Sequence, residues 1–480
     1  MTKKISRRTF LRLFGAGTVA AGSAAVIGCK QEGSTTASRQ EPPVGKMTYR
    51  VNHNTQDKVS ILGYGMMRLP TKGQTLGARQ EGDEEVDQEM VNRQVDYALA
   101  HGLNYFDTSP VYTQGKSEHH TGIALHRHPR KSYFIATKMS NMHSYSREDS
   151  IEMFNNSLRE LQTTYIDYYL LHSIGGTNDE FPDALDLFKA RFLDNGILAF
   201  LQQKKKEGVI RNLGFSYHGD IRVFDHALKM HDQGEAHWDF VQIELNYLDW
   251  HWANEINDRN TDAEYLYDEL TKRNIPAVIM EPLLGGRLAN MPNKMVNQLK
   301  QKEPEASVAS WAFRYAATKP NVLTLLSGMT YMEHLKDNLL SLCPLKPLTK
   351  EEMTFLEEDI AKQIVDYKTI PCNDCKYCMP CPYGVDIPGI FVHYNKCLNE
   401  SNVPHDTEDP AYTKMRRAFL VGYDRSVPRL RQADHCIGCG TCEPMCPQKI
   451  RIPDELHKIS EYVEDLKQDK VESLSDQTSA

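Results

Sequence analysis

The sequence predicts an α/β protein: a (β/α)8 barrel followed by a small, mostly helical, cysteine-rich domain. Between residues 47 and 345, eight short apolar runs alternate with amphipathic segments, which is the pattern of a parallel barrel. Eight of the eleven cysteines then fall in two short runs after residue 369. A doubly wound open sheet is the alternative, and it is weakened because no Gly-x-Gly-x-x-Gly follows any of the runs.

The eight strand candidates are rich in β-branched and aromatic residues and are separated by turn-forming or polar residues. In order they are KVSILGYGMM, LNYFDTS, SYFIATKM, YIDYYLLHS, IRNLGFSYH, FVQIELNY, IPAVIMEP and NVLTLLSGM. Between the first two, Val91, Val95, Ala98 and Leu99 recur with helical spacing, and Gly102 is a stop signal. Similar spacers between the other strands predict the remaining barrel helices.

Two connections, 71–87 and 173–195, are longer than a turn requires. In a barrel both would lie over the C-terminal mouth, where binding loops are expected. The segment NYLDWHW adds Tyr247, Trp250 and Trp252 after the sixth strand. These aromatic side chains either offer a flat surface to a substrate such as a sugar or pack the loop onto the barrel.

The first 29 residues have the order of an export signal. The run SRRTFLR around Arg7 and Arg8 resembles the twin-arginine consensus, and an apolar stretch and the lipobox-like ending Val26-Ile27-Gly28-Cys29 follow. The alternative is a basic amphipathic helix. We expect twin-arginine export to the periplasm and a lipid anchor on Cys29. This anchor would be the only membrane contact, since no apolar run reaches the roughly 20 residues of a spanning helix.

Eight cysteines have the spacing of iron–sulfur ligands. The second run matches the bacterial ferredoxin pattern C-x2-C-x2-C-x3-C-P, whereas the first is one residue short before its last Cys. We expect two [4Fe–4S] clusters, with zinc or a single cluster as alternatives. By analogy with ferredoxins, one cluster takes Cys372, Cys375, Cys378 and Cys446, and the other takes Cys436, Cys439, Cys442 and Cys381. Cys343 and Cys397 are expected to be inert buried thiols.

Polar residues stand at the ends of three successive predicted strands, where a barrel places its chemistry. They are Asp107 in FDTSPVY, Lys138 in IATKM and His172 in LLHS, and Tyr112 lies five residues beyond Asp107. Singly, each suits an ordinary rim residue. Four such groups at matching positions indicate a site.

This set resembles the Asp-Tyr-Lys-His tetrad of the aldo/keto reductases, and FDTSPVYTQGKSE, FIATKM and DYYLLHS are similar to that family's motif blocks. The resemblance covers roughly residues 51–340. It implies that Tyr112 protonates the carbonyl oxygen, that Lys138 lowers the pKa of this phenol, that Asp107 holds Lys138, and that His172 orients the carbonyl.

The resemblance also implies a nicotinamide cofactor, NAD or NADP, at the barrel mouth. Its carboxamide would be held by Ser216 and Gln242, and its adenine end by Asp337 and Asn338. The chain departs from the family at the positions of the phosphate-binding Lys and Arg, the second carboxamide residue and the stacking aromatic, which are Gly328, His334, Tyr217 and Glu281. The choice between NAD and NADP is therefore open, and another carrier could replace both.

The cysteine segments CMPCPYGVDIP and ADHCIGCGTCEPMCPQKI resemble those of an iron–sulfur branch of the same family. This implies an exported oxidoreductase that interconverts a carbonyl and an alcohol, with electrons relayed through the clusters. The alternatives are an electron-transfer subunit and a binding lipoprotein that use the barrel as a scaffold. Expected partners are a small carbonyl or alcohol substrate, such as a sugar, and a redox protein or membrane electron carrier. The net charge of −8 argues against nucleic acid.

These observations predict six segments. They are an export signal (1–28), a polar tether (29–46), the barrel (47–345), a connecting helix (346–368), a ferredoxin-type 4Fe–4S dicluster domain (369–455) and a charged tail (456–480).

Overall fold

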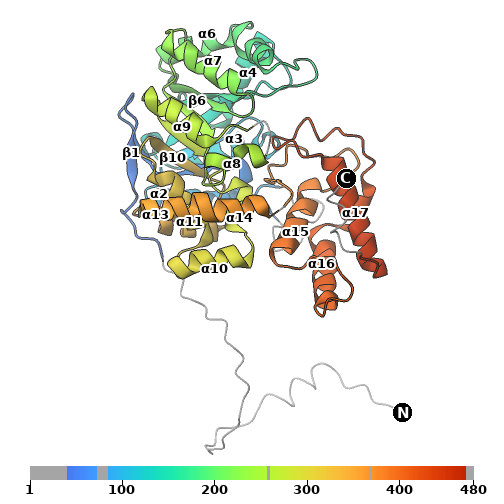
Figure 1. Ribbon diagram of the computed structural model, residues 1–480. Helices are drawn as coiled ribbons and strands as arrows, with labels where there is room; N and C mark the ends of the chain where they lie inside the picture. Colours follow the sequence, from blue (N-terminus) through green and yellow to red (C-terminus); the bar gives the residue numbers. More distant parts are fainter. Residues whose placement is uncertain (1–40, 73–84, 257–259, 368, 472–480) are drawn as a thin grey trace, which may run out of the picture. The chain divides into compact units, whose positions relative to one another are not determined.

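The computed structural model describes residues 41–72, 85–256, 260–367 and 369–471 (Figure 1). The predicted export signal, the Cys29 anchor, most of the tether and the end of the tail lie outside these residues, as does much of the connection 71–87. In the part of the chain that is described, no helix is long and apolar enough to cross a bilayer.

Eight parallel strands form a closed barrel, which confirms the predicted fold. The strands are β3 (Leu62–Gly65), β4 (Tyr105–Asp107), β5 (Phe134–Met139), β6 (Ile166–Ile174), β7 (Ile210–Tyr217), β8 (Phe240–Glu244), β9 (Ala277–Met280) and β10 (Val322–Ser327). Seven of these strands lie within the predicted runs, and β6 extends one residue beyond its run, to Ile174. The open-sheet alternative is wrong, because β10 pairs with β3 through Leu325 opposite Leu62 and closes the barrel.

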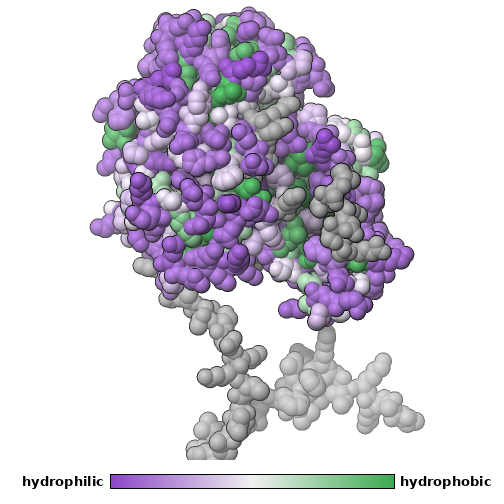
Figure 2. All heavy atoms as spheres, viewed as in Figure 1, coloured by the Kyte–Doolittle hydropathy of each residue, from purple (hydrophilic) through white to green (hydrophobic). Residues whose placement is uncertain are grey.

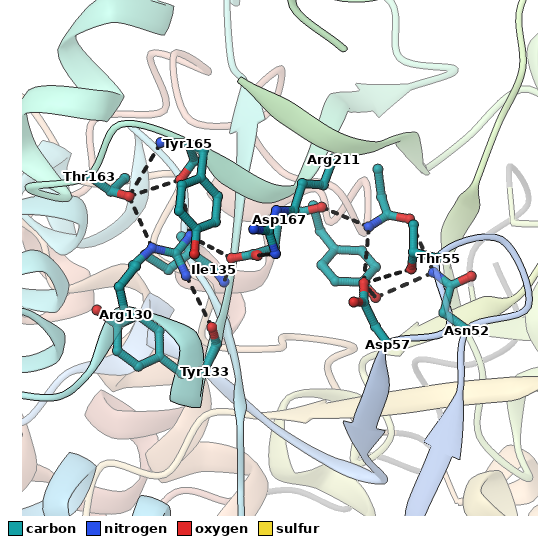
Figure 3. A network of polar contacts seen from close by, with 12 residues as sticks. Asn52, Thr55, Asp57, Arg130, Tyr133, Ile135, Thr163, Tyr165, Asp167 and Arg211 are labelled. Atoms are coloured by element: carbon teal, nitrogen blue, oxygen red, sulfur yellow. Dashed lines mark hydrogen bonds and ion pairs between the residues drawn. The ribbon is translucent and has the colours of Figure 1, made fainter. Parts of the chain in front are cut away.

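The first predicted run is divided between two structures. Its start forms β2 (Lys58–Ser60), which pairs antiparallel with β1 (Tyr49–Val51), and only its second half enters the barrel as β3. Val59 of this hairpin packs in the barrel interior. Asp57, beside it, accepts a 3.1 Å hydrogen bond from Tyr168 at the start of β6, within the polar network of Figure 3. The hairpin therefore covers the N-terminal end of the barrel.

Amphipathic helices surround the strands, as the spacing predicts. They are α2 (Gln88–Ala100), α3 (Ser117–Leu125), α4 (Arg147–Glu160), α5 (Ala184–Phe188), α6 (Ile197–Lys206), α7 (Ile221–Asp232), α8 (Asp249–Ile256), α9 (Ala263–Lys272), α10 (Asn293–Lys302), α11 (Val308–Thr318) and α12 (Met332–Leu342). Helix α2 shows the local signals clearly: Asp87 caps its first turn by accepting from the Met90 amide, and Gly102 follows its end with φ +89°.

The aromatic segment after β8 belongs mainly to the core. Tyr247 and Trp250 are buried, and the Lys319 ammonium lies 3.1 Å from the centre of the Trp250 ring. Tyr315 of α11 packs against both aromatic rings. For these two side chains the packing interpretation is confirmed.

A mostly helical domain follows the barrel. Helices α13 (Lys350–Thr354) and α14 (Ala361–Asp366) lead to α15 (Ile387–Asn399), α16 (Tyr412–Ser426) and α17 (Ile452–Gln468), and the two cysteine runs lie in loops between them. Phe391, Phe419 and Tyr462 belong to its own hydrophobic core. The face seen in Figure 2 is mostly hydrophilic, with small hydrophobic groups scattered over it.

Glu118 of α3 is a buried acid inside this fold, and it makes barrel stability depend on pH. Thr137 donates a 2.5 Å hydrogen bond to it, but burial outweighs this contact and raises the pKa of Glu118 to about 7. The unfolded chain would ionise near pH 4.5, so between these values the folded state holds the extra proton. Stability is therefore lost as the pH rises from about 4.5 to 7.

We predict that Glu118→Gln increases the free energy of unfolding at pH 8 by up to about 3 kcal/mol. At pH 4.5 this gain in the free energy of unfolding should largely vanish, because the buried Glu118 carboxyl is then neutral, like the amide of the variant. Urea unfolding of the two proteins at both pH values measures this, with the exposed Glu148→Gln as the control. An equal gain at both pH values would show that burial of the charge is not the cause.

Candidate active site and cysteine centre

An ion pair is buried at the C-terminal end of the barrel. Asp107 is the last residue of β4, and Lys138 stands near the end of the neighbouring strand β5. The Lys138 ammonium donates to Asp107 Oδ1 at 2.6 Å and to the Thr108 carbonyl at 2.8 Å. Both side chains are almost fully buried. The closed barrel thus gives Lys138 a fixed position and a counter-charge.

Tyr112 and His172 lie beside this pair. Tyr112 stands in the turn Tyr112–Gly115 after β4, and its ring centre is 4.6 Å from the Lys138 ammonium. His172, on β6, faces the tyrosine ring edge-on at 5.8 Å. Its Nδ1 lies 2.5 Å from the Ser140 hydroxyl. The structure therefore brings together all four residues of the predicted tetrad.

The electrostatics of the tetrad keep Tyr112 and His172 neutral. Burial, with Asp107 and Glu281, raises the pKa of Tyr112 well above its usual range. Burial, with Lys138, also lowers the pKa of His172 well below its usual range. The sequence led us to expect a lowered pKa at Tyr112. The direction is opposite because Asp107 already balances the charge of Lys138, so burial dominates.

A cavity of about 1030 Å³ lies over this site. Tyr112 and His218 line it from the barrel, and Cys375, Tyr377 and Cys446 line it from the cysteine-rich domain. The predicted proton donor and two predicted cluster ligands therefore share one cavity.

The predicted carboxamide ligands are neighbours in the barrel. Ser216 on β7 and Gln242 on β8 are paired in register. The Ser216 hydroxyl accepts from the Ser173 amide at 2.8 Å. Gln242 Oε1 is buried without a hydrogen-bond partner. An unpaired amide oxygen is an acceptor for a carboxamide N–H, although neither Ser216 nor Gln242 is among the residues that line the cavity.

The predicted adenine end is different. On α12, Asp337 accepts from the Ser307 hydroxyl at 2.6 Å, and Asn338 donates to Ser327 at 2.9 Å. Neither residue lines the cavity described above. Near the predicted phosphate position Gly328, a Cβ would stand 3.2 Å from Arg68 Cδ. His334, the other predicted phosphate position, and Arg68, beside Gly328, do line the cavity. A guanidinium is therefore available near the predicted phosphate position, while Asp337 and Asn338 lie away from the cavity.

Arg68 is one of several site residues that the sequence analysis missed. It follows β3 and reaches the cysteine-rich domain, where it pairs with Asp374 at 3.7 Å and donates to the Asn373 carbonyl. Only the folded contact reveals this role, because nothing in the local pattern distinguishes Arg68 from a solvated arginine.

Arg191 and Tyr377 were also missed. Arg191 donates to the carbonyls of His172 at 2.7 Å and Ser173 at 3.0 Å, so it holds the end of β6. Tyr377 is close enough to Tyr112 and Cys375 for both to raise its pKa, although burial is the larger cause. The sequence did hold one signal for Tyr377, because it lies inside the first cysteine run. A loop that carries Cys375 to the barrel mouth also carries Tyr377 there.

The eight cysteines form two electrostatic neighbourhoods. Cys378 interacts mainly with Cys375, Cys372 and Cys446. Cys442 interacts with Cys436, Cys381 and Cys439. These interactions agree with the pairing that the ferredoxin analogy implies, Cys381 included, although Cys378 also interacts with Cys442, and the pairing stays a prediction. Cys343 and Cys397 lie outside both groups and are buried.

The donor set fits two [4Fe–4S] clusters. Burial raises the pKa of Cys372 and of Cys375 to about 12, so both are neutral thiols until a metal displaces their protons. Among the described residues, no three His, Cys, Asp or Glu side chains converge as the ligands of a single ion do. Each thiolate of a [4Fe–4S] cluster binds a different iron, and two groups of four thiols supply two such clusters.

Known proteins resemble both parts of the chain. Residues 371–452 match the 4Fe-4S dicluster domain, which favours iron–sulfur clusters over zinc. The "Uncharacterized oxidoreductase YqkF" of Bacillus subtilis is 26% identical over 293 residues, covering 56% of this chain and 87% of the relative. The L-galactose dehydrogenase of Arabidopsis thaliana is 25% identical over 344 residues, or 68% and 98% of the two chains.

Among solved structures, the holo form of aldo-keto reductase AKR11C1 from Bacillus halodurans is 25% identical, with a TM-score of 0.49 over 65% of this chain and 96% of that one. Residues 62–360, more than half of the sequence, match the aldo/keto reductase family. The chain therefore belongs to the aldo/keto reductase family of oxidoreductases and carries a C-terminal 4Fe-4S dicluster domain.

Proposed function

We propose that this oxidoreductase interconverts a carbonyl and an alcohol in the cavity between its two domains, with electrons relayed through two [4Fe–4S] clusters. The observation that carries the proposal is the shared lining of this cavity. Tyr112 enters it from the barrel, and Cys375 and Cys446 enter it from the cysteine-rich domain. A proton donor and two cluster ligands thus border the same space.

Tyr112 would donate the proton that the carbonyl oxygen needs. Its phenol is neutral because burial raises its pKa, so the acid form is present at any ordinary pH. Lys138, 4.6 Å from the ring, is the nearby cation that can stabilise the tyrosinate left after donation. Neutral His172 would hydrogen-bond the carbonyl without competing as a cation. In the oxidation direction the same residues would take the proton back.

Reduction of a carbonyl also consumes two electrons and a second proton. A nicotinamide, when bound, supplies these together as a hydride, whereas [4Fe–4S] clusters supply single electrons. Gln242 and Ser216 would hold the nicotinamide carboxamide, and NAD and NADP remain equal candidates.

The substrate would be a small carbonyl or alcohol compound, such as a sugar. The electron partner would be a redox protein or a membrane carrier. Cys439 and Ile437 of the second cysteine run are exposed, which gives such a partner access to that group of ligands.

The cofactor is tested first on anaerobically prepared protein that lacks residues 1–28. Bound cofactor is extracted for mass analysis, and visible and EPR spectra are recorded as NADH and then NADPH is added. We expect a co-purified dinucleotide or reduction of the clusters by one of the two. Intact clusters with no dinucleotide and no response would assign the electrons to another carrier.

The tetrad is tested by Tyr112→Phe, which removes the proton donor and keeps the ring. With reduced methyl viologen as an artificial electron donor and a panel of aldoses and ketones, we expect turnover to fall by roughly 10²–10⁴-fold. Cluster content should not change. Tyr265→Phe, an exposed tyrosine outside the cavity, is the control. Unchanged turnover in Tyr112→Phe would refute the tetrad mechanism, whereas no turnover in the wild type on any member of the panel would favour the electron-transfer-subunit alternative.

Export and anchoring are the last part of the proposal, supported by the order of Arg7, Arg8 and Cys29 in the sequence. Replacing both arginines by lysine should leave the precursor in the cytoplasm, because the twin-arginine route reads that pair. Cys29→Ala should abolish fatty-acid labelling and release the protein from the membrane fraction. The control changes Lys3 and Lys4 to glutamine. Normal export of the double-lysine variant would exclude this route.

A further inference from the structure

One turn of the barrel contacts the chain both before and after Cys372, the first predicted cluster ligand. The turn is Leu284–Ala289, after β9. Arg287 Nη2 donates to the Thr369 hydroxyl at 2.9 Å, three residues before Cys372. Gly285 meets the residue just after Cys372: a Cβ on Gly285 would stand 2.4 Å from the Cα of Asn373. Cys372 therefore lies between two fixed contacts with one barrel turn.

The second terminal nitrogen of the Arg287 guanidinium lacks a hydrogen-bond partner within the described part of the chain. Nη1 is buried, and no hydrogen bond to it is formed by the described residues. Burial lowers the pKa of Arg287, while Asp249 and Cys372 act in the opposite direction. Asp249 and the Cys372 thiol are therefore the acidic groups near this cation. A buried cation with a free N–H needs an anion or another acceptor.

Asp249 is a poor counter-charge for Arg287. Burial raises the pKa of its carboxyl to about 8, so it is mostly protonated at neutral pH. Its Oδ1 is itself buried without a partner, and its Oδ2 accepts from Asn246 at 2.6 Å. The remaining acidic neighbour is Cys372, whose sulfur becomes a thiolate when iron binds.

We propose that Arg287 supplies the positive charge beside the [4Fe–4S] cluster held by Cys372, Cys375, Cys378 and Cys446, and that it raises the reduction potential of this cluster. A cluster with four thiolate ligands is anionic and becomes more so on reduction. A fixed buried cation therefore stabilises the reduced form more than the oxidised form. The barrel, through Arg287, tunes the cluster that borders its own cavity.

A second explanation of the free N–H is a bound water. A small cavity of about 30 Å³ is lined by Arg287, Thr369 and Asn395, among others, and is large enough for one molecule. A water there would satisfy Nη1 without making the potential depend on the charge of Arg287. The two explanations differ in one result: removing the charge of Arg287 changes the reduction potential of the cluster only if the guanidinium acts on the cluster.

The experiment is an anaerobic redox titration, followed by EPR, of the protein with both clusters. The variants are Arg287→Gln, which removes the charge and can still donate to Thr369, and Arg287→Lys, which keeps the charge. In Arg287→Gln the ratio of reduced to oxidised cluster should fall about tenfold for one cluster at a fixed ambient potential, equivalent to about 59 mV for a one-electron couple. The other cluster and Arg287→Lys should stay close to the wild type. Iron and sulfide content is measured first, as a check on folding.

Arg416→Gln is the matched control, because it removes the same charge from α16, where Arg416 donates to the carbonyls of Leu466 and Lys467. It should move neither potential. Unchanged potentials in Arg287→Gln, or an equal shift in Arg416→Gln, would overturn the proposal. If Arg287→Gln loses a cluster, Arg287→Lys becomes the test. A large negative shift in reduction potential in this variant, which keeps the charge, would also overturn the proposal. The readout is a potential, so the result does not depend on whether the enzyme reduces carbonyls.

Discussion

The site depends on the contact between the first cysteine loop and the mouth of the barrel. Arg68 pairs with Asp374 and donates to the Asn373 carbonyl, and Gly285 lies against the Asn373 backbone. Any side chain at Gly285 would clash with this loop, and its φ of +66° also favours glycine. These contacts, with the hydrogen bond from Arg287 to Thr369, hold the loop that carries Cys375 at the cavity that Tyr112 also lines.

Burial is the main electrostatic effect beneath that loop. It raises the pKa of Tyr112 and lowers that of His172, so both are neutral, and it also lowers the pKa of Lys138, which the hydrogen bond to Asp107 at 2.6 Å opposes. A neutral phenol beside a fixed cation is arranged to release a proton only when a substrate can take it. The closed barrel fixes this arrangement, because strands β4, β5 and β6 hold Asp107, Lys138 and His172, and the turn after β4 holds Tyr112.

The two groups of cysteines differ in their surroundings. Cys375 and Cys446 border the cavity, whereas Cys439 is exposed. Cys378 of the first group also interacts with Cys442 of the second, so the two groups are neighbours. This order, from the surface through two adjacent ligand groups to the cavity, suits electrons that enter or leave one at a time.

The sequence by itself determined the barrel, the cysteine groups and the tetrad. Strand–helix alternation depends on local periodicity, and Asp107, Lys138 and His172 could be found because parallel strands end at one rim. Only the tertiary structure decided the direction of the Tyr112 pKa shift and the roles of Arg68, Arg191 and Arg287. Their contacts join segments far apart in the chain, and burial depends on what covers a residue rather than on its neighbours in sequence.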